Sequence, residues 1–284
     1  NFRNFFILII YIMTAELKAI LESHSLPALK KFVRDSNLSV GTLKRAELIA
    51  LMIKNKTKFK NYYSSGSLKM GIFLSEKSKI NLQPLVSKSI CFISEYVDSY
   101  VSSSDKSKND FIKLQKELFS YVVLWCNKNN YGLKVILRKN SKHISYENEV
   151  NFFRSNRELK KVTFFENNPD KLSSYKNIFG SDMIIALDSA LAIEFFSQGH
   201  KVLFCPVYKI KTLRNIQFQE YLSNLPDINI LKDLDINLFN KKMNKLLYMN
   251  NNEYYYSTEH IRGEYMNYGE PYAHEIISKF ITAE

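Results

Sequence analysis

The feature that most constrains the fold is the order of apolar runs and turns in residues 181–206. Residues 183–187 are almost wholly apolar, which is typical of a strand that is covered on both faces. Residues 201–205, apolar after Lys201, come soon after Gly199, and glycine is the residue that most often terminates a helix. The pattern predicts a strand, a helix and a parallel strand. We therefore expect an α/β fold with a Rossmann-like parallel sheet and flanking helices.

The polar turn of this unit, Asp188 and Ser189, lies where such folds bind ligands. Both residues follow the carboxyl end of the first predicted strand. They precede a helix N-terminus, which carries about half a positive charge and has N–H groups without intrahelical acceptors, so that it readily holds phosphate. The same two residue types are also ordinary helix caps. The turn by itself leaves both interpretations open.

Residues 194–202, Glu-Phe-Phe-Ser-Gln-Gly-His-Lys-Val, resemble the Glu-Ala-x-x-x-Gly-x-Pro-Val stretch of GT-B glycosyltransferases. They look closest to the surface-carbohydrate and capsule members, with some likeness to glycerophosphotransferases that use CDP-glycerol. The resemblance implies that Asp188, Ser189 and Ala190 face the diphosphate of a nucleotide-sugar donor. It also implies that Glu194 binds the ribose hydroxyls. The first acidic residue of the family's motif is absent. Without the resemblance, Glu194 would be interpreted as a solvent-facing position on a helix.

The resemblance extends over other parts of the chain. Residues 69–76 look like the first strand and loop of the donor-binding half. Residues 110–128 have the apolar spacing of an amphipathic helix. A strand then ends in Arg138 and Lys139, similar to the family's strand followed by Arg-Pro, with a lysine in place of the proline. The resemblance implies that both cations lie at the sugar donor, and residues 162–166 are a further predicted strand.

The likeness spans residues 68–283 and implies half of an enzyme. GT-B glycosyltransferases have two Rossmann-like domains, and the first supplies the acceptor site. Residues before 68 are too few for such a domain, because one parallel crossover unit alone takes about 30 residues. We therefore expect residues 68–284 to form a nucleotide-sugar-binding domain that transfers sugar only with a separate acceptor-domain protein.

The first residues predict neither a membrane span nor a signal peptide. The apolar run 5–13 is shorter than the roughly 20 residues that cross a bilayer, and no cleavage site follows it. Met13 predicts a translation start, which makes residues 1–12 upstream read-through or a disordered leader; a membrane-surface anchor is the alternative. Three widely spaced cysteines in apolar runs fit reduced thiols in the cytoplasm.

Residues 13–57 predict a small all-α N-terminal module, joined by a linker, residues 58–67. Residues 37–49 resemble the SAP module and the related Rho-type N-terminal helical module, although one extra residue separates Gly41 from Lys44. Residues 13–61 hold ten Lys and Arg against four Asp and Glu, which favours DNA or RNA contact through phosphates. A helical bundle with solvated lysines, or a protein-docking module, is the alternative. The predicted contact residues are Lys30, Lys31, Arg34, Lys44 and Arg45.

Other chemistry finds little support in the sequence. The five histidines and three cysteines show no metal-ligand spacing, and no phosphate-binding glycine loop or dinucleotide fingerprint occurs, so we predict neither metal nor cofactor. His200 either approaches a phosphate of the sugar donor or is an exposed turn residue. Residues 254–256, three tyrosines, either stack on a base or divide between core and surface.

Two functions from different classes follow. The first is a GT-B-like domain that binds a nucleotide-activated sugar for surface polysaccharide synthesis. The alternative is a SAP-like nucleic-acid-binding protein whose α/β domain is not catalytic. A fragment or gene fusion without independent activity is the third reading.

Overall fold

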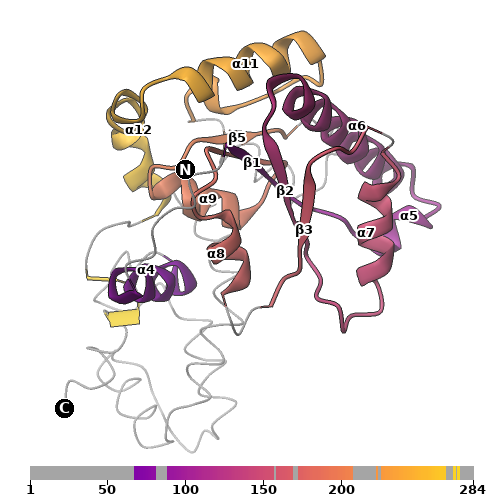
Figure 1. Cartoon of the computed structure of the whole chain (residues 1–284), viewed down its shortest axis with the longest axis horizontal. Coiled ribbons are helices and arrows are strands. Elements are labelled where there is room, and N and C mark those ends of the chain that lie inside the picture. Colours follow the sequence, from indigo (N-terminus) through magenta and orange to yellow (C-terminus); the bar gives the residue numbers. More distant parts are fainter. Residues whose placement is uncertain are drawn as a thin grey trace, which may run out of the picture. The chain divides into compact units, whose positions relative to one another are not determined.

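The fold is organised around a five-stranded sheet in which every neighbouring pair of strands is parallel (Figure 1). The computed structural model describes residues 67–80, 88–156, 158–168, 172–206, 222, 225–266, 271–272 and 274–275. The order of the strands across the sheet is β3-β2-β1-β4-β5. Their bounds are β1 Ser89–Ile93, β2 Gly132–Ile136, β3 Val162–Phe165, β4 Met183–Ala186 and β5 Val202–Phe204.

Helices cover both faces of this sheet. Phe92 of β1 contacts aromatic rings of α6 and α7, whereas Phe204 of β5 contacts Phe196 of α9. Phe92 pairs with Ile185 and Phe204 with Ala186, which are consecutive residues of β4, so the two phenylalanines lie on opposite faces. The described helices are α4 Leu68–Ile80, α5 Asp98–Val101, α6 Lys106–Asn129, α7 Tyr146–Arg154, α8 Ser173–Ile178, α9 Ala190–Ser197, the 3-10 turn η3 Asp227–Asn229, α11 Ile236–Tyr248 and α12 Asn251–Tyr265.

This arrangement confirms the predicted α/β fold with a Rossmann-like sheet. The chain runs outward from β1 through β2 to β3, then returns to the other side of β1 with β4 and β5. The strand order therefore reverses between β1 and β4. In open α/β sheets, the crevice beyond the carboxyl ends of the strands at such a reversal is the usual ligand site.

The unit predicted from residues 181–206 forms as β4, α9 and β5. Residues 183–186 and 202–204 are buried strands that pair in parallel. Gly199 follows α9 with φ of +86°, a backbone conformation that glycine adopts without the cost that a side chain would bring. Among the described helices, none is both long and apolar enough to cross a bilayer.

One sequence prediction was wrong. Residues 69–76 are not a strand and loop but belong to α4, and the first strand is Ser89–Ile93. Met70 and Phe73, three residues apart, are buried on one side of α4, which is helical spacing. The side chain of Ser67 accepts a hydrogen bond from the Met70 N–H at 3.3 Å and so begins the helix.

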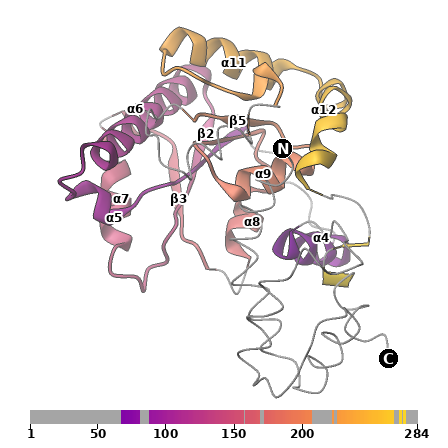
Figure 2. The ribbon, with the colours of Figure 1, turned by 180° about the vertical axis from the view of Figure 1, so that it is seen from behind.

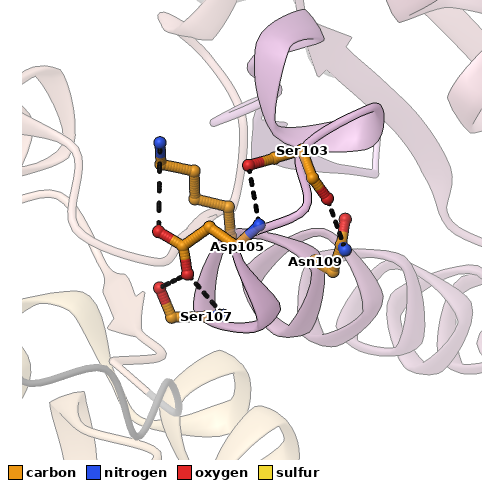
Figure 3. Close-up of polar contacts among 5 residues, drawn as sticks. Ser103, Asp105, Ser107 and Asn109 are labelled. Carbon is orange, nitrogen blue, oxygen red and sulfur yellow. Dashed lines mark hydrogen bonds and ion pairs between the residues drawn. The ribbon is translucent and has the colours of Figure 1, made fainter.

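The start of α6 also differs from the prediction by several residues. The helix begins at Lys106 rather than near 110, because Asp105 provides a strong N-cap (Figure 3). The Asp105 carboxylate accepts hydrogen bonds from the Ser107 N–H at 2.9 Å and the Ser107 hydroxyl at 2.6 Å. Ser103 Oγ accepts from the Asp105 N–H at 3.1 Å, and Asn109 Nδ2 donates to the Ser103 carbonyl at 2.8 Å. These bonds order the turn before the helix.

The last described helix, α12, packs on α9 (Figure 2). Arg262 of α12 is fully buried, and its Nη1 lies 3.5 Å from the carbonyl oxygen of Ser197, the last residue of α9. Its guanidinium stacks 3.7 Å from the ring centre of Tyr255. A cation at a helix C-terminus is electrostatically favourable. Residues beyond β5 also extend the sheet, since Ile230 forms a parallel bridge with Phe204.

Candidate functional site

The candidate site is the carboxyl edge of the sheet between β1 and β4. Residues 94–97 follow β1 there, and residues 187–189 lead from β4 into α9. The loop between β2 and α7, residues 137–145 (the β2–α7 loop), leaves the same edge beside β1. Three loops from non-consecutive parts of the chain thus share the edge at which the strand order reverses.

In the turn before α9 the two side chains are buried, whereas residues of the first helical turns are partly exposed. Asp188 and Ser189 are 7% and 8% exposed, whereas Ala190, Leu191 and Glu194 are partly exposed. Within the described residues, Ser189 is the N-cap of α9 but makes no capping hydrogen bond with its side chain. The first N–H groups of a helix have no intrahelical acceptor. A ligand that approaches this turn therefore meets first-turn N–H groups more readily than the two side chains.

Glu194 is oriented by a neighbouring helix. The hydroxyl of Tyr175, in α8, donates a hydrogen bond of 2.6 Å to Glu194 Oε2. Tyr175 is itself held between the rings of Phe73 and Phe195. The Glu194 carboxylate is thus placed one turn from the start of α9, in a fixed relation to α8.

Glu149, in α7, joins two of the three loops. Its carboxylate is fully buried and accepts hydrogen bonds from the Ser94 hydroxyl at 2.5 Å, the Arg138 N–H at 2.8 Å and the Lys139 N–H at 3.1 Å. Burial raises the pKa of Glu149, and these hydrogen bonds and the Arg138 charge oppose that effect. Glu149 therefore fixes the chain after β1 relative to the chain after β2.

Arg138 and Lys139, predicted to act together, extend in different directions. Arg138 Nη1 donates to the carbonyl oxygen of Tyr96 at 3.1 Å, so this side chain lies toward the loop after β1. Lys139 Nζ lies 3.3 Å from His143 Nε2, within the β2–α7 loop. Arg138 therefore lies at the loop after β1, where the strand order reverses, whereas Lys139 lies beside His143 within its own loop.

His200 packs against aromatic rings, and the tyrosines of residues 254–256 divide between core and surface. The His200 ring packs edge-on against Phe179 and Phe195, and burial, helped by the nearby Lys77 charge, lowers its pKa to about 4. Tyr254 is 1% exposed, Tyr255 37% and Tyr256 70%, so the run divides between core and surface. In the part of the chain that the structure describes, no three His, Cys, Asp or Glu side chains gather in a way that could hold a metal ion.

The predicted nucleic-acid module and the linker, residues 13–57 and 58–67, lie outside the described residues, apart from Ser67. The structure therefore places none of the proposed phosphate-contacting cations, which remain a prediction. These are Lys30, Lys31, Arg34, Lys44 and Arg45.

Sequence reasoning missed Glu149 and His143. A signal for Glu149 exists, because Tyr146, Glu149, Val150 and Phe153 follow the i, i+3, i+4, i+7 spacing of one helix face. A carboxylate among apolar residues on such a face indicates a buried, hydrogen-bonded acid. No comparable pattern singles out His143.

Comparison with known proteins gives one family. Residues 45–225 match the model of a family described as "putative O-antigen biosynthesis protein". No curated protein and no solved structure matches the chain. The matched region includes β1 to β5 and the candidate site. Because it covers well over half of the 284 residues, the chain belongs to this family.

Proposed function

We propose that the chain binds a nucleotide-activated sugar at the reversal between β1 and β4 and takes part in surface polysaccharide synthesis. The family description supports the pathway. The observation that carries the site is the start of α9 at this point, with a partly exposed first turn and no side-chain capping bond from Ser189 within the described residues. Phosphate is the ligand chemistry that such a terminus favours.

In this proposal each predicted donor-binding residue except Lys139 has a defined part. The N–H groups at Ala190 and Leu191 bind the diphosphate, and the buried Asp188 and Ser189 shape the turn that presents them. Arg138, two strands away, lies about 10 Å from the end of β4 by the usual strand spacing, and contributes positive charge from the side of β1. Glu194 accepts hydrogen bonds from ribose hydroxyls.

Sugar transfer in this proposal requires an acceptor domain of GT-B type. The α9 terminus and Arg138 would then stabilise the negative charge that develops on the leaving diphosphate. The three cysteines are buried free thiols, which fits the reducing cytoplasm that the proposal assumes.

Isothermal titration calorimetry with UDP-, CDP- and GDP-sugars tests the proposal, and Ala190→Pro sharpens the test. Proline at the first helical position removes one N–H and leaves the helix intact. Ser189 has φ of −74° and ψ of 127°, a conformation suited to a residue that precedes proline. We expect the substitution to weaken nucleotide-sugar binding about tenfold, the value of one charge-assisted hydrogen bond.

Lys106→Pro, at the first position of α6, is the matched control. Its N-cap Asp105 also has extended dihedrals, φ −72° and ψ 110°. This variant should bind the sugar donor as the wild type does. Absence of binding for all three nucleotide classes at millimolar concentration, or equal weakening by both prolines, would contradict the proposal.

The uneven charge of the chain supports a second candidate function. Residues 13–61 carry ten basic against four acidic residues. A salt-dependent mobility shift with duplex DNA, lost in Lys44→Glu plus Arg45→Glu, would support nucleic-acid binding. An unaltered shift in that variant would contradict the predicted contact residues.

A further inference from the structure

The β2–α7 loop holds more hydrogen-bond donors than acceptors around one histidine. His143 Nδ1 lies 3.1 Å from the Ser145 N–H, which donates to it. On the other side of the ring, Lys139 Nζ lies 3.3 Å from His143 Nε2. The imidazole is therefore approached by a donor at each of its two nitrogens.

A neutral imidazole can accept at only one nitrogen. With Nδ1 accepting from Ser145, Nε2 carries the proton, and its N–H faces the Lys139 ammonium. In the other tautomer, Nδ1–H faces the Ser145 N–H. A protonated ring has donors at both positions. In each case a donor faces a donor. Where Nε2 carries the proton, as it does when Nδ1 accepts from the Ser145 N–H, an anionic oxygen beside Nζ and Nε2–H would satisfy both donors.

The charges of the loop favour an anion there. Residues 138–143 include two lysines, an arginine and this histidine, with no Asp or Glu. Lys139 is half-buried and His143 is exposed, so both are accessible from solvent.

The carboxylates that face the loop are already engaged. Asp98 accepts from the Tyr96 hydroxyl at 2.9 Å, Asn148 Nδ2 at 3.0 Å and the Ser145 hydroxyl at 3.3 Å. These bonds, led by that of Tyr96, lower the pKa of Asp98. The Glu149 carboxylate accepts the Lys139 N–H rather than its ammonium. Glu166, from the loop after β3, accepts from the Ser141 N–H at 2.7 Å.

We propose that Lys139 Nζ and His143 Nε2–H bind a phosphate group, at a site distinct from the start of α9. Arg138 extends toward the loop after β1, while Lys139 and His143 lie within their own loop. A phosphate on an acceptor substrate and the phosphate of a nucleotide share this chemistry. The site stands on the contacts of the β2–α7 loop and does not depend on the proposed sugar-donor site.

Inorganic phosphate is the probe, with the imidazole 1H–13C resonance of His143 followed by NMR. Chloride at equal ionic strength controls for screening. We expect a saturable shift with phosphate and none with chloride. Lys139→Met keeps the alkyl chain and should weaken phosphate binding about tenfold.

His143→Asn and Lys142→Met complete the design. Asparagine offers an oxygen near the position of Nδ1 for the Ser145 N–H but lacks the Nε2 donor, so phosphate binding, followed by 31P NMR, should weaken about tenfold with the fold retained. Lys142 is an exposed lysine of the same loop, and Lys142→Met should change the affinity less than twofold. No saturable shift in the wild type, or equal weakening by Lys139→Met and Lys142→Met, would overturn the proposal.

A nucleoside diphosphate distinguishes the sources of the phosphate. If its binding is weakened by Lys139→Met and not by Ala190→Pro, the loop takes nucleotide phosphate; this supports the loop site and contradicts the sugar-donor site. If inorganic phosphate depends on Lys139 while the diphosphate depends on Ala190, both sites stand, and the loop takes the phosphate of another substrate.

Discussion

Removing the Glu149 carboxylate should destabilise the fold more than any other single change at the candidate site. Glu149→Ala leaves three donors without their acceptor: the Ser94 hydroxyl, which is 1% exposed, and the partly buried N–H groups of Arg138 and Lys139. A buried donor left unpaired costs about 1–3 kcal/mol. With Ser94 counted in full and each N–H at half, because water reaches it in part, the loss is about 2–6 kcal/mol. That is a large share of the roughly 5–15 kcal/mol by which such domains are stable.

Urea denaturation followed by circular dichroism measures this loss, and Glu147→Ala is the matched control. Glu147 lies in the first turn of the same helix and is exposed, so its removal alters the helix dipole interaction similarly. We expect the control to change the free energy of unfolding by less than about 0.5–1 kcal/mol. Glu149→Gln, which keeps one acceptor, should fall between the two.

The same residue gives a pH dependence. Because burial raises the pKa of Glu149 in the folded state, the folded protein holds this proton more tightly than the unfolded chain does. The stability that this proton contributes is present below the ordinary glutamate pKa and is lost as pH rises through the folded value. Glu149→Gln should remove that slope. A loss below about 1 kcal/mol in Glu149→Ala, or one equal to that of Glu147→Ala, would refute the reasoning.

Three further outcomes are expected. In Gly199→Ala, the new Cβ would lie 2.7 Å from Tyr255 Cδ2 and 3.1 Å from Arg262 Nη1, at a φ of +86°. Backbone strain and crowding together should lower the free energy of unfolding by about 2–5 kcal/mol, measured by thermal or urea unfolding. A loss under about 1 kcal/mol would contradict this packing. His200, with a pKa lowered from 6.5 to about 4, should make the protein less stable as pH falls through that window, because only the unfolded chain takes up the proton. His200→Phe should flatten the curve of unfolding free energy against pH in this window, measured by urea denaturation. An unchanged slope in that variant would contradict the assignment to His200. All three cysteines are buried, and burial raises the pKa of each thiol, that of Cys126 to about 12. Ellman's reagent should therefore react with the native protein only at the rate of unfolding. Rapid labelling would show that a thiol is accessible and would contradict the prediction.

Strands that helices cover on both faces were predictable from sequence. Residues 183–187 and 202–205 are continuous apolar runs because neither face of β4 or β5 meets water, and these runs contain the strands Met183–Ala186 and Val202–Phe204. Residues 69–76 also contain a short apolar run, Met-Gly-Ile-Phe-Leu at 70–74, but form part of α4. A short apolar run cannot by itself distinguish a strand from a buried helix. The three-residue spacing of the buried side chains and the Ser67 cap, rather than hydrophobicity, account for the helix.

The candidate site was predictable only where neighbouring residues build it. Asp188, Ser189 and Ala190 follow a recognisable strand directly, so their place at the carboxyl edge could be inferred from order alone. The bond from Ser94 to Glu149 joins residues 55 apart, and its existence depends on how α7 packs against β1. The spacing of residues 146–153 indicates that Glu149 is buried, but it does not indicate which groups donate hydrogen bonds to its carboxylate. Contacts of this kind require the assembled sheet.

The position of Arg262 sets a practical limit on trimming the chain. The family match stops at residue 225, yet the end of α9 relies on a guanidinium that arrives from α12, well past that limit. A recombinant piece cut at the homology boundary would strip away that cation and the aromatic ring stacked on it, and would leave the edge of β5 without its Ile230 neighbour. Expression work should therefore retain the sequence at least through Tyr265, since the sugar-binding hypothesis can be judged fairly only on a polypeptide whose α9 keeps its contacts with α12.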